Sequence, residues 1–430
     1  MHSLYWLIAI GCSWFSGDST KSKVNEEAST EVASDAPTSQ KGIEGSDIQQ
    51  KDEGDISEDA ESLPPLAFEY IESISDMNRQ TRLVDQPYLG PFIDTIVHIW
   101  FHSMHETHIQ ELEKVLDEQS VSKIIFMPTP FQGSNPRTEK RTATLEKKVQ
   151  KKKAGKRNNL QAVTNKNRSV TSTKSSKQAS QKIGIIRGLG AQRVGWFCDS
   201  QSIASQLKGD EALVESRRSA ITKKARTDLS NPLCIGLGEI GVAHGAKREG
   251  QPSIFMDIDH GILMEVIDDV MRAEKWMYVH LEPLDVESDT VSDETVFQGL
   301  VKVCRQFPSA RLIVSHTMMT NPQNVRNVLE TCPNVYTNIK ILHQEWKNWK
   351  LLEPIHNSDG QLYEDWAKLF EDMPTRFFIG SDFKLWRETK DDAIAYGKTV
   401  EEYRSMLGTL QPSVAEQIAY KNAERLLFAR

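Results

Sequence analysis

Short runs of apolar and β-branched residues recur along most of the chain, and the stretches between them place apolar residues at helical spacing. We predict eight strands from these runs, at residues 91–99, 122–128, 193–198, 233–240, 276–281, 311–316, 334–340 and 376–382. Amphipathic helices are predicted at 106–117, 261–274, 294–306, 322–331, 361–372 and 413–428. Strands that alternate with helices indicate a parallel sheet, and eight such units favour a closed (β/α)8 TIM barrel over an open sheet.

Two polar segments lie outside this pattern. Residues 13–65 hold four Lys and thirteen Asp or Glu, whereas residues 131–182 hold fifteen Lys or Arg and two Glu. Because neither segment has periodic apolar residues, neither can bury enough surface to offset its loss of conformational entropy. We therefore predict a disordered acidic linker at 13–65 and a disordered basic insertion at 133–182, which interrupts a barrel domain that spans 66–430.

Composition and charge narrow the class of protein. The chain of 430 residues has a formal net charge of −8 and a hydrophobic content of 38%, which argues against a uniformly basic nucleic-acid binder and against a wholly disordered chain. The basic insertion 133–182 has the charge to contact an anionic lipid surface or a nucleic acid, but it lacks interleaved aromatic residues on which bases would stack. A solvated loop is the simpler interpretation of this segment.

The N-terminus has the features of an export signal. A short apolar run, Leu4 to Ile10, is followed by Gly11 and Cys12, a pattern that resembles the lipobox of bacterial lipoproteins. On this interpretation residues 1–12 are a signal peptide, Cys12 is lipidated, and the protein is anchored to the periplasmic side of the cell envelope by that lipid alone. If the segment is an ordinary N-terminus, a cytoplasmic location is expected.

The cysteine content bears on the class of fold. Five cysteines in 430 residues argue against a small disulfide-dense scaffold. The four that follow Cys12 have no spacing typical of a metal site, and we interpret them as buried or free thiols. They are Cys198, Cys234, Cys304 and Cys332.

Candidate catalytic chemistry lies at the ends of the predicted strands. Five of these strands carry a histidine or a carboxylate at their last or next-to-last position, namely His98, Glu239, His280, His316 and Asp382. In a (β/α)8 barrel the carboxyl ends of the strands form the active-site face. Because side chains alternate along a strand, three sets are each predicted to share one face: Asp94, Ile96 and His98; Leu312, Val314 and His316; and Phe378, Gly380 and Asp382. Several such residues at strand ends predict a metal or acid–base site.

The same segments carry a family resemblance. FIDTIVH at 92–98 resembles the first strand of the amidohydrolase superfamily, in particular its amidohydrolase-related branch, and GLGEIG at 236–241 resembles a Gly-Glu-Ile-Gly strand of related metal-dependent hydrolases and deoxyribonucleases. ARLIVSH, PNVYTNI, RFFIGSD and NAERLL follow in the order of that branch. The resemblance covers about 66–130 and 183–430, and it implies a TIM barrel with a metal centre.

The resemblance also suggests a role for each residue. It implies metal ligation by His98, Glu239, His280, His316 and Asp382, proton transfer by Asp382, and orientation or protonation of the developing oxyanion by His316. One departure is that Ile96 occupies the position of the first histidine in the family's His-x-His pair. Since catalytic Zn²⁺ needs only three protein ligands, we expect one divalent ion, most simply Zn²⁺, rather than two.

Several further residues are candidates for this site. Glu282 and Lys340 follow strand ends and are predicted to contact substrate, with salt bridges as the alternative. His102, His105 and His108 are candidates to replace the missing ligand, although exposure is the simpler interpretation. GLGEIG also fits the dinucleotide fingerprint, but the sequence after it, VAHGAKREGQPS, predicts a loop and not the helix that this fingerprint requires.

The sequence thus predicts a hydrolase that cleaves an amide, lactone or ester bond of a small molecule with a metal-activated water. Two alternatives remain open at this point. One is a metal-independent lactonase or decarboxylase of the same superfamily, and the other is a catalytically degenerate barrel that acts as a tethered binding or scaffold protein. The insertion adds a third hypothesis, a nuclease drawn to polyanions.

Overall fold

A computed structural model describes residues 79–83, 86–99, 106–129, 185, 188–199, 203, 211–244, 254–282, 293–341, 354–357, 359–385 and 390–429. Chain contacts define two units, and all of these residues belong to the second, Leu63–Arg430. The predicted signal peptide with Cys12, the linker 13–65, the insertion 133–182, and the residues His102 and His105 lie outside the described residues. Within those ranges, no helix combines the length and the apolar character that crossing a membrane requires.

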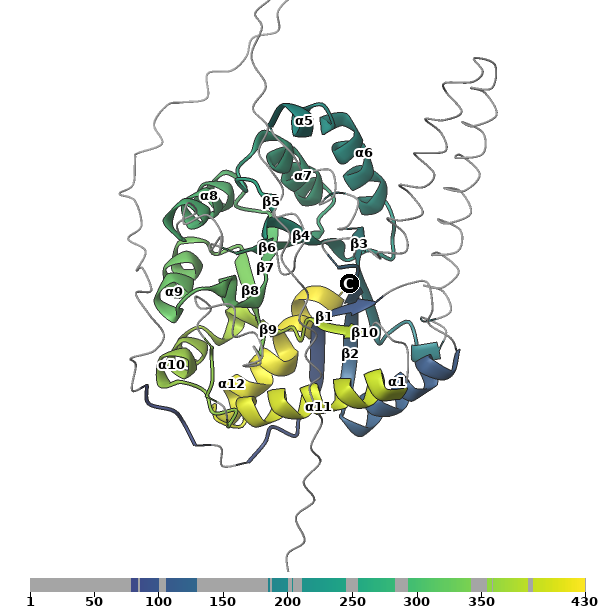
Figure 1. Cartoon of the computed structure of the whole chain (residues 1–430), viewed down its shortest axis with the longest axis vertical. Coiled ribbons are helices and arrows are strands. Elements are labelled where there is room, and N and C mark those ends of the chain that lie inside the picture. The colour runs from purple at the N-terminus through teal and green to yellow at the C-terminus, as the bar shows by residue number, and fades with distance from the viewer. Residues whose placement is uncertain are drawn as a thin grey trace, which may run out of the picture. The chain divides into compact units, whose positions relative to one another are not determined.

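Eight parallel strands close into a barrel, as the sequence predicts. They are β1 (Phe92–Ile99), β2 (Val121–Met127), β3 (Val194–Asp199), β4 (Gly236–His244), β6 (Trp276–Leu281), β7 (Arg311–Val314), β8 (Val335–Ile339) and β9 (Phe377–Ile379). Each strand pairs in parallel with the next one named, and the pairing of Asp94 in β1 with Ile379 in β9 closes the ring. The fold is therefore a (β/α)8 barrel (Figure 1).

Helices surround the barrel and connect its strands (Figure 1). The predicted ones are α1 (Glu106–Glu118), α7 (Gly261–Arg272), α8 (Asp293–Gln306), α9 (Pro322–Thr331) and α10 (Glu364–Asp372). The sequence prediction missed α5 (Glu211–Glu215), α6 (Arg218–Leu229) and α11 (Lys390–Leu407), together with the short strands β5 (Ile254–Phe255) and β10 (Phe383–Leu385). Helix α6 was missed because its many charged residues mask the helical spacing of its apolar ones. In the structure, Ile221, Ala225 and Leu229 form its buried face.

The C-terminal helix covers the N-terminal end of the barrel. It consists of α12 (Pro412–Glu416) and two π-helical segments, η4 (Gln417–Lys421) and η5 (Glu424–Phe428). Ala423 and Leu427 pack into the apolar cluster of the barrel interior, and the indole of Trp276, at the start of β6, donates a hydrogen bond of 3.2 Å to the carbonyl oxygen of Leu426. Because this end is filled by apolar side chains, we expect a ligand site at the carboxyl ends of the strands, where (β/α)8 barrels carry their active sites.

Glycine in GLGEIG permits close packing and does not open a helix. A Cβ on Gly236 would lie 1.9 Å from the carbonyl oxygen of Trp276 in the adjacent strand β6, so a larger residue there would push the two strands apart. The segment after the motif differs from the predicted loop, because β4 continues to His244 and its end pairs antiparallel with β5. A strand at this position excludes the dinucleotide fingerprint, which needs a helix here.

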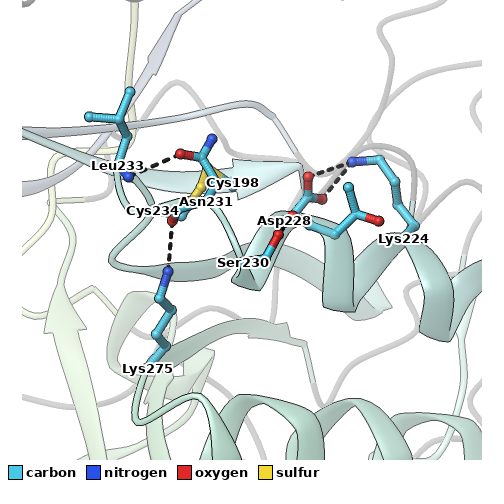
Figure 2. The surroundings of a disulfide bond; sticks show 9 residues. Cys198, Lys224, Asp228, Ser230, Asn231, Leu233, Cys234 and Lys275 are labelled. Atoms are coloured by element: carbon cyan, nitrogen blue, oxygen red, sulfur yellow. Dashed lines mark hydrogen bonds and ion pairs between the residues drawn. A yellow bond between two sulfur atoms is a disulfide. The ribbon is translucent and has the colours of Figure 1, made fainter.

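The interpretation of four cysteines as thiols is wrong. Cys198 in β3 is disulfide-bonded to Cys234, just before β4, and Cys304 in α8 is bonded to Cys332, just after α9. Figure 2 shows the first bond beside the turn that precedes β4, where Lys275 Nζ donates to the carbonyl oxygen of Asn231 at 2.8 Å. The partners are 36 and 28 residues apart in sequence, so spacing could not pair them, whereas neighbouring positions in the barrel bring them together.

Candidate metal and acid–base site

All five strand-end residues converge at the carboxyl end of the barrel. His98, Glu239, His280, His316 and Asp382 supply ligand atoms to compact groups in which every atom lies within 4.8 Å of the others. Their side chains are between 1% and 7% exposed. The predicted cluster of these five residues is therefore present.

The side chains of strand β1 do not alternate strictly between its two faces before His98. The pairing of β1 with β2 shifts between Asp94 and Val97, so Ile93 and Ile96 both lie in the interior cluster. Asp94 does not share that face, because its carboxylate accepts a hydrogen bond of 3.1 Å from Tyr396 in α11 outside the barrel. The predicted grouping of Asp94 with Ile96 and His98 is wrong for this reason.

Strand β7 also departs from the predicted face. Leu312 and Val314 belong to the outer cluster, while Ile313 points into the barrel interior. His316 reaches the site because the chain turns at the strand end, where residues 316–319 all have positive φ values between 51° and 60°. The His316 amide donates a 2.8 Å hydrogen bond to Asn338 Oδ1, which fixes this turn against β8.

The third predicted grouping agrees with the structure. Phe378 lies in the interior cluster, and a Cβ on Gly380 would contact the Asn338 amide and Ile96 Cγ2 at 2.2 and 2.5 Å. Asp382 follows with a φ of 53° and points at His98. Ile96, in the position of the family's first histidine, is fully buried in this apolar layer.

One group of ligand atoms comprises His98, Glu239 and Asp382. His98 Nε2 lies 2.7 Å from Asp382 Oδ1 and 3.5 Å from Glu239 Oε2. Despite these distances, His98 Nε2 makes no hydrogen bond of acceptable geometry with either carboxylate or with any other described residue. Buried polar atoms are nearly always satisfied by a hydrogen bond, so a buried nitrogen that faces two carboxylates without a well-aligned hydrogen bond fits a cation held among the three side chains.

Neighbouring charges shift the pKa values of His98 and Asp382. Burial acts against a charged His98, but the carboxylates of Asp382 and Glu239 outweigh it and raise the pKa of His98 to about 9. Burial acts against a charged Asp382 as well, yet Lys340 and Lys384 hold the pKa of Asp382 well below its usual value. Asp382 is therefore a carboxylate at neutral pH, able to bind a cation or accept a proton.

A second group comprises Glu239, His280 and His316. Glu239 Oε1 lies 2.7 Å from His280 Nδ1 and 3.4 Å from His316 Nε2, and it accepts a hydrogen bond from the hydroxyl of Ser315. Burial opposes the charge of Glu239, but the interaction with His280 holds the pKa of Glu239 well below its usual value. Ser315 is a site residue that the sequence prediction missed, since strict alternation places it on the face opposite to His316.

His316 is a neutral imidazole at neutral pH. Burial is the main reason that its pKa falls to about 3, and the positive charge of Lys340 contributes. Its Nδ1 atom is buried and makes no hydrogen bond to any residue that the structure describes. His316 can thus donate a hydrogen bond or ligate a metal, and its predicted role toward a developing oxyanion stays a prediction.

The two predicted substrate contacts lie at the edge of the cluster. Lys340 Nζ donates to Asp382 Oδ2, and Glu282 Oε1 lies 2.7 Å from His280 Nε2. Both residues are buried, at 9% and 2% exposure. Contact of either residue with a substrate stays a prediction.

The remaining histidines divide into one outside the cluster and one within it. His108 lies in α1 and is half-buried, and it belongs to none of the three groups of ligand atoms found among the described residues. His244, which the sequence prediction placed in a loop, is at the end of β4 and forms a third group with His280 and Glu282. Its position four residues beyond the predicted strand 233–240 was the only signal for it.

Fold and site together define a (β/α)8 barrel with a buried histidine–carboxylate centre. No family model matches the sequence, and no curated protein sequence matches it. Similar solved structures include dihydroorotase from Campylobacter jejuni, with 10% identity, a TM-score of 0.39, and coverage of 79% of this chain and 83% of that chain. The 2,6-dihydroxybenzoate decarboxylase from Rhizobium has 12% identity, a TM-score of 0.38, and coverage of 78% and 98%.

A third similar structure is 4-oxalomesaconate hydratase from Rhodopseudomonas palustris, with 11% identity, a TM-score of 0.34, and coverage of 78% of this chain and 95% of that chain. Identities and scores at this level describe a likeness of the chain path. The barrel assignment rests on the strand pairing, and the candidate chemistry rests on the side chains described above.

Proposed function

We propose that this protein is a metal-dependent hydrolase of the amidohydrolase type that cleaves an amide, lactone or ester bond of a small molecule. The observation that carries the proposal is the convergence of His98, Glu239 and Asp382 around a buried His98 Nε2 that makes no hydrogen bond to the described residues. One nitrogen and two carboxylate oxygens suit Zn²⁺ or a similar first-row cation. Such a cation, when bound, polarises the scissile carbonyl and lowers the pKa of a water molecule.

The protein's own residues supply the proton transfer and the orientation. Asp382 is ionised beside Lys340 and Lys384, so it accepts the proton of the attacking water. The neutral imidazole of His316 donates a hydrogen bond to the oxygen on which negative charge develops. We further propose that the ammonium of Lys340, which lies beside Asp382, pairs with an anionic group of the substrate.

Metal analysis of the purified full chain tests this proposal. We expect stoichiometric Zn²⁺, Mn²⁺ or Fe²⁺, and hydrolysis of at least one member of a panel of lactones, esters and amides. Asp382→Asn should lose this hydrolysis and the ion at His98, whereas Asp359→Asn, on an exposed turn residue, should retain both. A chain that carries no metal and whose activity is indifferent to chelators would rule out the metal mechanism.

One observation favours a second candidate, a metal-independent lactonase or decarboxylase. The ammonium of Lys340 already supplies a positive charge to Asp382 Oδ2, and Ile96 removes one ligand of the family's centre. This candidate predicts activity in the presence of chelator that is lost in Lys340→Met. If neither metal binding nor turnover is found, the degenerate binding or scaffold barrel is the remaining interpretation.

We also propose that the protein is exported. Two buried disulfides support this proposal, because such bonds persist in oxidising compartments and are uncommon in the cytosol. They agree with the signal-peptide interpretation of residues 1–12.

Cell fractionation tests the proposed export: the parent chain should be found in the envelope fraction, and Cys12→Ser should release it from the membrane. A parent chain found in the cytosol with four reduced thiols would refute export.

A further inference from the structure

His280 lies between two buried carboxylates. Its Nδ1 atom is 2.7 Å from Glu239 Oε1, and its Nε2 atom is 2.7 Å from Glu282 Oε1. All three side chains are at most 3% exposed. A neutral imidazole carries one N–H, so it can donate to one of these two carboxylates and faces the other with a lone pair. With the N–H on Nδ1, the lone pair of Nε2 faces the carboxylate of Glu282, and a cation between the two would bind both.

His244 completes a set of ligands around that position. Its ring stacks on the ring of His280, with centroids 4.4 Å apart and an interplanar angle of 30°. The ligand atoms of His244, His280 and Glu282 all lie within 4.8 Å of one another, and all three residues are buried. Two imidazoles and one carboxylate are a donor set found in catalytic zinc sites, with one position open for water or substrate.

This set shares no residue with the group of His98, Glu239 and Asp382, whereas the group of Glu239, His280 and His316 takes residues from both. The set of His244, His280 and Glu282 and the group of His98, Glu239 and Asp382 can therefore each hold an ion at the same time. We propose that His244, His280 and Glu282 form a second cation site, selective for Zn²⁺-like ions and displaced from the centre that the amidohydrolase resemblance implies. Hydrolysis is not a premise of this proposal.

The two sites would be linked through Glu239. Its Oε2 atom faces His98, while its Oε1 atom faces His280 Nδ1. A carboxylate that accepts the Nδ1 proton orients the ring and makes Nε2 a better ligand. Glu239 would thus act as a ligand at one site and as a positioning residue for the other.

Zn²⁺ titration of the full chain, with bound metal measured after equilibrium dialysis, tests the second site. The parent should bind two Zn²⁺ ions per chain and His244→Phe one, since phenylalanine keeps the stacked ring but has no lone pair. Glu282→Gln should likewise bind one. Asp382→Asn should lose the other ion, and the double variant His244→Phe/Asp382→Asn should bind none. His260→Asn is the matched control, because asparagine preserves the helix cap that His260 provides, and it should bind two.

The outcomes separate this proposal from the proposed function. If the parent and His244→Phe bind the same number of ions while circular dichroism shows both folded, the second site does not exist, and a doubly protonated His280 bridges the carboxylates instead. If His244→Phe loses an ion but Asp382→Asn loses none, the second site stands and the catalytic ion of the proposed function fails. Displacement of this Zn²⁺ by equimolar Ca²⁺ would contradict the nitrogen-rich donor set.

Discussion

His98 Nε2 and Asp382 Oδ1 lie 2.7 Å apart, although 284 residues separate them in the chain. The pairing of β1 with β10, in which Val97 lies opposite Phe383 and His98 opposite Lys384, brings them together. This seam exists only when the barrel closes, so the candidate centre requires the closed sheet. A defect at either end of the barrel domain is therefore expected to remove the site.

Ile96→His tests whether the first histidine of the family pattern is needed. Ile96 is fully buried against Gly380. An imidazole there should lower the free energy of unfolding by about 1–3 kcal/mol, because its buried ring nitrogens would lack hydrogen-bond partners. Urea unfolding measures this change, and the milder Ile96→Val should lower it by about 1 kcal/mol. We expect the metal content to stay at its parental value. A metal-free parent that gains metal and activity on this substitution would identify a degenerate enzyme.

Ser315→Ala should weaken metal binding without unfolding the protein. The Ser315 hydroxyl donates to Glu239 Oε1, and loss of such a supporting bond lowers metal affinity by roughly 10- to 100-fold. Competition with a chromophoric zinc chelator measures the affinity. Ser216→Ala, which removes a hydroxyl from an exposed residue, should leave it unchanged. Equal affinities in the two variants would argue against Glu239 as a ligand.

Both disulfides should form and should stabilise the barrel. In a Cys12→Ser background, mass spectrometry after alkylation should find no modified cysteine in the denatured, unreduced chain and four after reduction. Each bond closes a loop of 36 or 28 residues, so removing either pair should lower the free energy of unfolding by about 3–4 kcal/mol. Cys304→Ala/Cys332→Ala leaves the first pair intact and serves as its control. Alkylation of four cysteines before reduction would contradict the assignment.

Asp94 should make stability depend on pH between about 4 and 6. Burial raises the pKa of Asp94 from 3.8 to about 6, against hydrogen bonds from Ser381, Ile96 and Tyr396. Because the folded state binds the proton more tightly, this contribution to stability is fully present below the unfolded pKa and is lost as the pH rises through 6. The loss is about 3 kcal/mol, at 1.4 kcal/mol for each pKa unit.

The variant Asp94→Asn isolates this effect. It removes the titration, so its free energy of unfolding relative to the parent should improve by about 3 kcal/mol between pH 4 and pH 7. Urea unfolding at both pH values measures the difference. Asp359→Asn, on an exposed residue, should follow the parent at each pH. A constant difference between Asp94→Asn and the parent would show that Asp94 ionises normally.

The sequence alone determined the eight strands, most of the helices and five of the site residues. Strand periodicity and apolar runs are local properties of the chain, so they can be predicted from the sequence. The polar residue at the end of an apolar run is equally local, which is why His98, Glu239, His280, His316 and Asp382 could be named in advance.

The tertiary structure alone decided which way several of these residues face and what they touch. The register shift in β1 turns Asp94 outward, and the left-handed turn at 316–319 brings His316 to Glu239, beside Ser315. Closure of the ring sets these features, because pairing with neighbouring strands overrides simple alternation. Disulfide pairing and the group of His244, His280 and Glu282 depend on distances between strands, which no spacing along one chain encodes.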